Sequence, residues 1–221
     1  MILVTGDLHA EYGYINKLIN KKKPKLVICC GDFGYWPKFK NINALKNGDT
    51  KVLFCDGNHE DHWALRDRIT DELAPNVFYM PRGSTYTLPD GRTILFMGGA
   101  NSIDKHLRTI GKTWFPEETI TQNDVLNVPL DLKVDIVISH TCPNELLYEM
   151  LPYNSTKDKD PSYKALSYIL ETYQPKLWYF GHWHIFKKGV IPKTNTKWTC
   201  LSAADFGDQW WIKLEEKESN G

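Results

Sequence analysis

The chain has 221 residues, and its 27 Lys and Arg residues balance 27 Asp and Glu residues, so the formal net charge is zero. This balance excludes strongly basic nucleic-acid-binding proteins and acidic tail proteins as classes. Hydrophobic residues make up 42% and aromatic residues 13% of the chain, which excludes general disorder. A length of this order predicts one domain, which we place at residues 1–214, followed by a polar tail at 215–221.

Nothing in the sequence suggests secretion or membrane insertion. No run approaches the ~18 consecutive apolar residues of a membrane span, and the first ten residues indicate a strand rather than a signal peptide. The five cysteines are odd in number and form no CxxC pair, which favours reduced thiols. We therefore expect a cytoplasmic protein.

Short apolar runs alternate with amphipathic stretches along the chain. Runs of this length, rich in β-branched and aromatic residues, predict strands buried on both faces. In chain order the patterns predict strand 2–4, helix 14–22, strands 26–30 and 52–55, helix 62–69, a hairpin of strands 85–88 and 92–97, helix 117–126, strand 136–138, helix 162–173, strand 177–180, and strands 186–191, 198–202 and 209–214. Residues 157–160 read as a mixed-charge loop. The order predicts an α/β protein with two sheets packed as a sandwich and helices outside.

Five of the predicted strands lead directly into residues that can bind a metal. These residues are Asp7 with His9, Asp32, Asn58 with His59, His140, and His182 with His184. The carboxyl ends of strands are where sites assemble in such sheets. A lone Asp after a strand is usually a turn former, but five coincident strand ends are hard to explain in that way.

The residue types indicate the kind of site. Asp, His and Asn without thiolates suit ions such as manganese, iron, magnesium or zinc, and they argue against a closed structural zinc site. The supply of ligands is too large for one ion and predicts two adjacent metals, a recognised device for displacement at phosphorus. Glycine precedes Asp7, Asp32, Asn58 and His182, where it allows tight turns and close packing.

Five motifs carry a family resemblance. GDLH at 6–9, GDFG at 31–34, GNHE at 57–60, SH at 139–140 and GHWH at 181–184 resemble, in order, the motifs of the calcineurin-like metallophosphoesterases. The resemblance implies a four-layer α/β/β/α sandwich of two mixed sheets, and phosphoester hydrolysis at a two-metal centre. It also implies two divalent metal ions as cofactors, with manganese favoured and iron, zinc, magnesium and nickel as alternatives.

By motif position, the resemblance implies a role for each ligand. Asp7, His9 and His184 would hold the first metal. Asn58, His140 and His182 would hold the second, and Asp32 would bridge both. A bridging hydroxide would attack phosphorus. His59 would bind phosphate and protonate the leaving group, and Asn58 would also donate to a phosphate oxygen.

The chain departs from the Ser/Thr protein phosphatase branch of this family. That branch shows GDxxDRG, whereas here Tyr35 and Trp36 follow GDFG, so the carboxylate that orients the acid histidine is missing. Glu60 and Asp61 are candidates to orient His59, or either caps the helix that follows. Tyr35 and Trp36 either wall the substrate pocket or pack under its loop. His62 is predicted to be a solvent-facing helix residue rather than part of the cleft.

Residues 98–108 and 114–117 resemble a stretch in uncharacterised bacterial and phage metallophosphoesterases. We hypothesise that Arg108 or Lys105 contacts a substrate phosphate, given arginine's fit to phosphate, and that Trp114 stacks on a base or sugar. The alternatives are a surface salt bridge for the two cations and a core position for Trp114.

Three functions remain open at this stage. The first is a phosphodiesterase or phosphomonoesterase acting on a small or nucleotide-like substrate. The second is a nuclease of the same superfamily, which the neutral charge disfavours because tight duplex binding needs many phosphate contacts. The third is a non-catalytic interaction scaffold, which the complete ligand set disfavours. No membrane partner is expected, and the sequence leaves the oligomeric state open.

Overall fold

The computed structural model of the chain describes residues 1–150 and 160–217. The expected polar tail lies partly outside the described residues, at 218–221, and so does most of the expected mixed-charge loop at 157–160. None of the helices in the described segments is long and apolar enough to cross a membrane.

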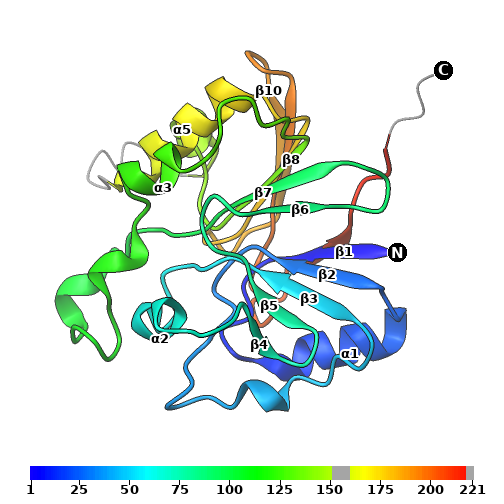
Figure 1. The fold of residues 1–221 in the computed structure, drawn as a ribbon, viewed down its shortest axis with the longest axis vertical. Helices are drawn as coiled ribbons and strands as arrows, with labels where there is room; N and C mark the ends of the chain where they lie inside the picture. The colour runs from blue at the N-terminus through cyan, green and yellow to red at the C-terminus, as the bar shows by residue number, and fades with distance from the viewer. Residues whose placement is uncertain (151–159, 218–221) are drawn as a thin grey trace.

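Within the described residues the strands form two six-stranded sheets (Figure 1). The first sheet has the order β12-β1-β2-β3-β5-β4, and the second has the order β10-β11-β9-β8-β7-β6. Each has four neighbouring parallel strands with an antiparallel strand at either edge. Their bounds are β1 Ile2–Thr5, β2 Leu26–Cys29, β3 Lys51–Phe54, β4 Glu72–Ala74, β5 Val77–Tyr79, β6 Thr85–Thr87, β7 Thr93–Met97, β8 Ile136–Ser139, β9 Leu177–Phe180, β10 Lys187–Ile191, β11 Thr196–Cys200 and β12 Trp211–Lys213.

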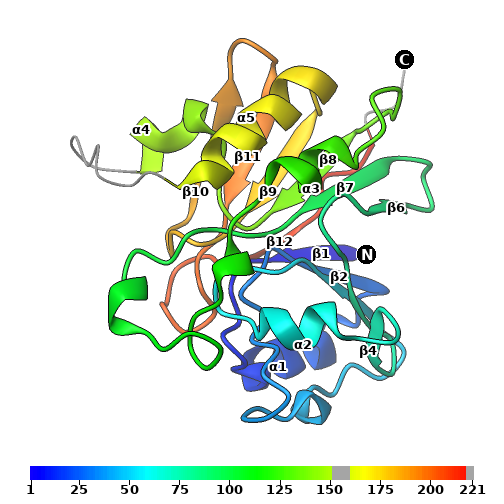
Figure 2. The ribbon, with the colours of Figure 1, turned by 60° about the vertical axis from the view of Figure 1, so that its left-hand side comes forward.

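Helices cover the outer faces of both sheets (Figures 1 and 2). In the first half of the chain α1 (Tyr12–Lys22) and α2 (His62–Arg66) lie against the first sheet. In the second half α3 (Gln122–Leu126), α4 (Leu147–Met150) and α5 (Pro161–Tyr173) lie against the second. The layers are therefore α/β/β/α, which confirms the predicted fold class.

The apolar strand runs pack on both of their faces, as predicted. In β1, Val4 joins the core between the two sheets, whereas its neighbour Leu3 joins the core beneath α1. Ile28 and Val27 divide in the same way in β2. This alternation follows from the two-residue period of a strand and explains why the run is continuously hydrophobic.

Several predicted elements need correction. The helix expected at 117–126 is a 3₁₀ turn at Pro116–Glu118 followed by α3, which begins after Thr121 in a capping box with Asp124. The helix expected at 62–69 ends at Arg66. The strands β4 and β5 and the helix α4 were not predicted, because runs of three or four residues give no clear period.

Candidate metal centre

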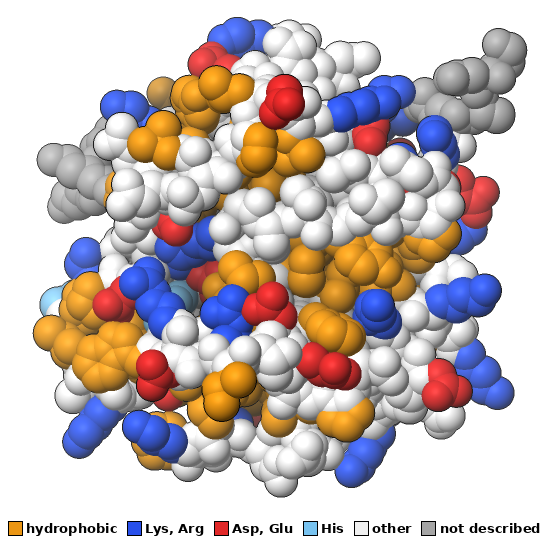
Figure 3. Space-filling view, viewed as in Figure 1, with side chains coloured by type: hydrophobic (Ala, Val, Ile, Leu, Met, Phe, Trp, Pro, Cys, Tyr) orange, Lys and Arg blue, Asp and Glu red, His pale blue; other side chains and the backbone are white. Residues whose placement is uncertain are grey.

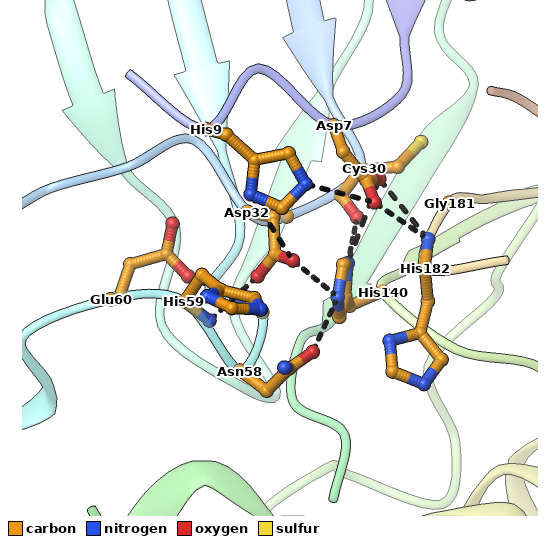
Figure 4. Close-up of polar contacts among 12 residues, drawn as sticks. Asp7, His9, Cys30, Asp32, Asn58, His59, Glu60, His140, Gly181 and His182 are labelled. Carbon is orange, nitrogen blue, oxygen red and sulfur yellow. Dashed lines mark hydrogen bonds and ion pairs between the residues drawn. The ribbon is translucent and has the colours of Figure 1, made fainter. Parts of the chain in front are cut away.

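Most of the predicted ligands come together where the parallel strands of both sheets end, and Figure 4 shows Asp7, His9, Asp32, Asn58 and His140 there. Asp7, Asp32 and Asn58 follow β1, β2 and β3 of the first sheet. His140 and His184 follow β8 and β9 of the second. The five coincident strand ends therefore form one site, built by both halves of the molecule.

One group of metal-capable side chains is Asp7, His9 and His184, the set predicted for the first metal. Asp7 Oδ2 lies 3.1 Å from His184 Nε2, and the Nε2 atoms of His9 and His184 lie 3.1 Å apart. Asp7 is fully buried, and the two histidine side chains are 23% and 27% exposed. Two ring nitrogens facing each other beside a carboxylate need a proton or a cation between them.

Asp32 lies between the histidines of the two predicted metal sites. Its Oδ2 lies 3.9 Å from His9 Nδ1 on one side and 3.4 Å from His140 Nε2 on the other. Burial raises the pKa of Asp32, but His140, His59 and His9 outweigh it and hold the pKa well below its usual range. Asp32 is therefore an ionised carboxylate that lies between the two predicted sets of ligands, and its bridging role stays a prediction.

Asn58 and His140 face each other on the other side of Asp32. Asn58 Oδ1 lies 3.1 Å from His140 Nε2. His140 Nδ1 lies 2.9 Å from the carbonyl oxygen of Cys30, which can only accept, so Nδ1 carries a hydrogen. Histidine ligands are commonly held in this way, with the other ring nitrogen turned to the metal. A further metal-capable group joins His140 to Asp7 and Asp32.

His182 is the predicted ligand whose side chain lies outside these groups. Its backbone N–H lies 3.1 Å from both carboxylate oxygens of Asp7. Its ring turns away from the other ligands (Figure 4) and packs edge-on to the ring of His140, with 4.9 Å between centroids. His182 belongs to none of the metal-capable groups among the described residues, so its role as a ligand stays a prediction.

Several residues in the loops of the site have an unusual backbone conformation. His9, Asp32, His182 and His184 all have positive φ, between 44° and 70°, a region that residues other than glycine seldom adopt. Such strain persists when surrounding structure enforces it, and it clusters at functional sites. Four of the seven predicted ligands share this feature, which supports a functional role for the cluster.

The residues present fit two divalent cations. Asp7, Asp32 and His140 are buried, and the cluster offers carboxylate, imidazole and amide donors without thiolate. Hard and intermediate cations prefer this donor set. All five cysteines are free and buried, and none of their thiols belongs to a metal-capable group of the described residues.

His59 contacts Arg108, a residue that the sequence analysis singled out. Arg108 Nη2 lies 3.1 Å from His59 Nε2, and Arg108 Nε lies 2.8 Å from Asp104 Oδ1. Because a guanidinium only donates, His59 Nε2 accepts here and carries no hydrogen. Burial lowers the pKa of His59, Asp32 opposes this effect, and Arg108 adds to it. His59 also lies within ligand range of His9 and Asp32, but its Nε2 faces a cation of the protein itself.

The two acidic candidates for orienting His59 have other roles. Asp61 caps α2 by accepting a hydrogen bond from the Ala64 backbone N–H at 3.0 Å, the alternative that the sequence left open. Glu60 is buried and accepts from the backbone N–H groups of Gly34 (2.9 Å) and Gly57 (2.6 Å). It therefore joins the loop after β2 to the loop after β3, and both loops carry ligands.

The expectation for His62 was wrong. This residue is 3% exposed rather than solvent-facing, and its Nδ1 lies 3.8 Å from Asp56 Oδ2. Trp36 both packs on Phe115 and donates from Nε1 to the backbone oxygen of His59 at 2.9 Å. Trp114 is half-buried, with Lys105 Nζ 6.0 Å from its ring centroid.

Sequence reasoning missed two buried side chains of the site, Ser102 and Glu118. Ser102 Oγ accepts a hydrogen bond from Asn58 Nδ2 at 3.2 Å, and Ser102 Oγ in turn donates to Glu118 Oε2 at 2.7 Å. Ser102 lies in the segment 98–108 that the sequence analysis singled out, but no role was predicted for it, and ordinary residue types far apart in the sequence gave no signal of its contact with Glu118.

A family model described as calcineurin-like phosphoesterase matches residues 1–186. The chain is 25% identical over 193 residues to the CWF19-like protein 1 homolog of Drosophila melanogaster. That match covers 79% of this chain but 34% of the relative, so the chain spans about a third of the relative's length.

Two solved structures share the fold. TT1561 of Thermus thermophilus has a TM-score of 0.57 at 13% identity, covering 92% of this chain and 89% of that one. Phosphopantetheinyl hydrolase (PptH) from Mycobacterium tuberculosis has a TM-score of 0.54 at 13% identity, covering 100% and 98%. With the family model matching most of the chain and the clustered strand ends in place, the chain belongs to the calcineurin-like phosphoesterase family, a family of metal-dependent phosphoester hydrolases.

Proposed function

We propose that this chain hydrolyses phosphoesters at a dinuclear metal centre. The observation that carries the proposal is the overlap of metal-capable groups at one point. Asp32 belongs to one group with His9 and His59 and to another with Asp7 and His140, so it links the two predicted sets of ligands. Shared carboxylates of this kind are what two adjacent cations require, and membership of the family supports the same chemistry.

In this proposal the ligand roles follow the sequence motifs. Asp7, His9 and His184 would hold one cation, Asn58, His140 and His182 would hold the other, and Asp32 would be shared by both. The cations would neutralise phosphate charge and make a water acidic enough to act as a nucleophile at neutral pH. We favour manganese, which matches the mixed oxygen and nitrogen donors, with iron, zinc, magnesium and nickel as alternatives.

The chain's own residues receive the phosphate and transfer a proton to the leaving group. Arg108 points its guanidinium at His59 and is held there by Asp104. A phosphate oxygen entering between them accepts hydrogen bonds from Arg108, which leaves His59 Nε2 free to take up the proton that the attacking water loses and to pass it to the leaving oxygen. Asn58 Nδ2 keeps one hydrogen for a phosphate oxygen, since a single hydrogen bond to Ser102 occupies the other.

We propose a small or nucleotide-like phosphomonoester or phosphodiester as substrate. The face shown in Figure 3 carries cations and anions interspersed, and the net charge is zero. Long nucleic acids are bound mainly through many phosphate contacts to clustered cations, so a nuclease activity is not favoured. The buried free thiols support a cytoplasmic location.

The test compares two chromogenic esters, a phosphomonoester and its bis-ester. The protein is stripped with a chelator and reloaded with Mn²⁺, and Asp32→Asn provides the blank. We expect Mn²⁺-dependent turnover of at least one ester that is absent from Asp32→Asn. Faster cleavage of the bis-ester identifies a phosphodiesterase, and faster cleavage of the monoester identifies a phosphatase. No metal-dependent turnover of either ester would contradict the proposal.

A further inference from the structure

The side chain of Asn58 has two ends of opposite polarity. Its Oδ1 can bind a cation, whereas its Nδ2 donates hydrogen bonds and cannot. Nδ2 lies 3.2 Å from Ser102 Oγ, and Oδ1 faces His140 Nε2 at 3.1 Å. Asn58 is 5% exposed, so contacts with the protein decide which end faces the metal centre.

Ser102 is itself fixed by Glu118. The Ser102 backbone N–H donates to Glu118 Oε1 at 2.6 Å, and its hydroxyl donates to Oε2 at 2.7 Å. Burial raises the pKa of Glu118, while both hydrogen bonds from Ser102 favour its ionised form. A carboxylate only accepts, so the Ser102 hydroxyl hydrogen is committed to Glu118, and its lone pairs are left to accept from Asn58.

The loop that carries this pair is anchored. The backbone oxygen of Glu118 accepts from the Ala100 N–H at 2.9 Å and from Arg82 Nη2 at 2.9 Å. Ser102 and Glu118 are each 1% exposed. The buried carboxylate of Glu118 therefore fixes the direction of both hydrogen bonds: Ser102 donates to Glu118, and Asn58 Nδ2 donates to Ser102.

We propose that Ser102 and Glu118 are positioning residues that turn Asn58 Oδ1 toward the metal shared with His140. The inference rests on the proposed function because it takes Asn58 as a ligand. Outer-shell partners of this kind commonly affect metal affinity by ~10–100-fold.

Two variants separate polarity from packing. Ser102→Ala removes the acceptor for Asn58 Nδ2. Glu118→Gln keeps the size of the side chain but introduces an amide N–H donor, which can occupy the Ser102 lone pair and release the Ser102 hydroxyl toward Asn58. The controls are Ser84→Ala, whose Oγ is buried without a partner among the described residues, and Glu117→Gln, next to Glu118.

The measurement is Mn²⁺ binding to metal-stripped protein by equilibrium dialysis, with electron paramagnetic resonance to detect coupled ion pairs. We expect wild type and both controls to bind two ions. Ser102→Ala and Glu118→Gln should bind one of them ~10–100-fold more weakly and lose the coupled signal at limiting Mn²⁺. The double variant should be no weaker than the single variants, because both act through one chain of hydrogen bonds.

Wild-type affinity for both ions in Ser102→Ala would overturn the inference even if Glu118→Gln failed to fold. Uptake of fewer than two ions by the wild type would overturn it as well. If wild type binds two ions and the variants lose one, but no phosphoester is hydrolysed, the proposed function fails while the positioning role stands.

Discussion

Glycine at two motif positions is required by the carboxylates that lie against it. A Cβ placed on Gly181 would lie 2.0 Å from Asp7 Oδ1, and one placed on Gly57 would lie 2.1 Å from Asp32 Oδ1. Real Cβ atoms do not approach other atoms so closely, so any side chain here displaces a predicted ligand. The motif glycines thus set the position of the ligands as much as the shape of the turns.

We predict that Gly181→Ala lowers Mn²⁺ affinity by at least about tenfold, because the new methyl group pushes Asp7 out of place. Isothermal titration of stripped protein measures the change. Gly13→Ala is the matched control: its Cβ would meet nothing within 4 Å, and it lies in α1, where alanine is favoured. Equal affinities in the two variants would contradict the placement of Asp7.

At Arg108 we predict that replacement by Ala raises KM for the substrate by roughly tenfold or more, since a charged hydrogen bond to phosphate is lost. Arg108→Lys should recover part of this loss. Lys112→Ala, an exposed cation of the same loop, is the control and should leave KM unchanged. Steady-state kinetics of the three variants and the wild type measure KM. An unchanged KM in Arg108→Ala would rule out the phosphate contact.

At the scale of elements, α2 begins with a buried histidine, His62. Burial lowers the pKa of His62 to about 4, with Asp56 opposing and Arg82 adding to the effect. The folded chain therefore keeps His62 neutral, whereas the unfolded chain takes up a proton below about pH 6.5. Between these values the unfolded state binds more protons, so stability falls as the pH is lowered from about 6.5 to about 4.

Replacing His62 with Leu should flatten this acid-side loss of stability. Denaturant unfolding at several pH values measures the free energy of unfolding, and the wild type should lose more of it between pH 7 and pH 4.5 than His62→Leu. Parallel curves for the two proteins would show that His62 does not titrate as its burial requires.

The same scale shows where sequence patterns stop being informative. The strand β2 was predictable from its continuous run of apolar residues. The run is continuous because the two faces of β2 pack into two different cores. Residues 117–121 carry a helical pattern, yet Arg82 Nη2 and Nη1 bind the backbone oxygens of Glu117 and Thr119 at 2.8 and 2.6 Å. These backbone oxygens accept hydrogen bonds from Arg82 instead of from backbone N–H groups of a helix. The sequence of residues 117–121 alone does not show this, because Arg82 lies far away in the chain.

For the molecule as a whole, the metal centre joins its two halves. Asp7, Asp32 and Asn58 belong to the loops of the first sheet, and His140 and His184 belong to those of the second. The motif residues were predictable because strand ends bring them together. Ser102, Glu118 and the partner of His62 were not, because those contacts depend on how one loop folds back over the site.

Cations that bind only the folded state should stabilise the whole domain. We predict that Mn²⁺ at about 100 times its Kd raises the free energy of unfolding by about 2.7 kcal/mol per site and that a chelator reverses this. Thermal melts with and without Mn²⁺ measure the effect as a rise in Tm. Asp32→Asn should respond much less, and an equal response would place the bound ions elsewhere.

The most direct test is a titration of stripped protein with Mn²⁺ in which bound metal and hydrolysis of the better ester are measured on the same samples. Two ions joined by Asp32 predict that activity follows the doubly loaded species, with little turnover up to one ion per chain and full turnover at two. Asp32→Asn should remain inactive throughout. Full activity at one ion per chain, or activity in the stripped protein, would contradict a dinuclear mechanism.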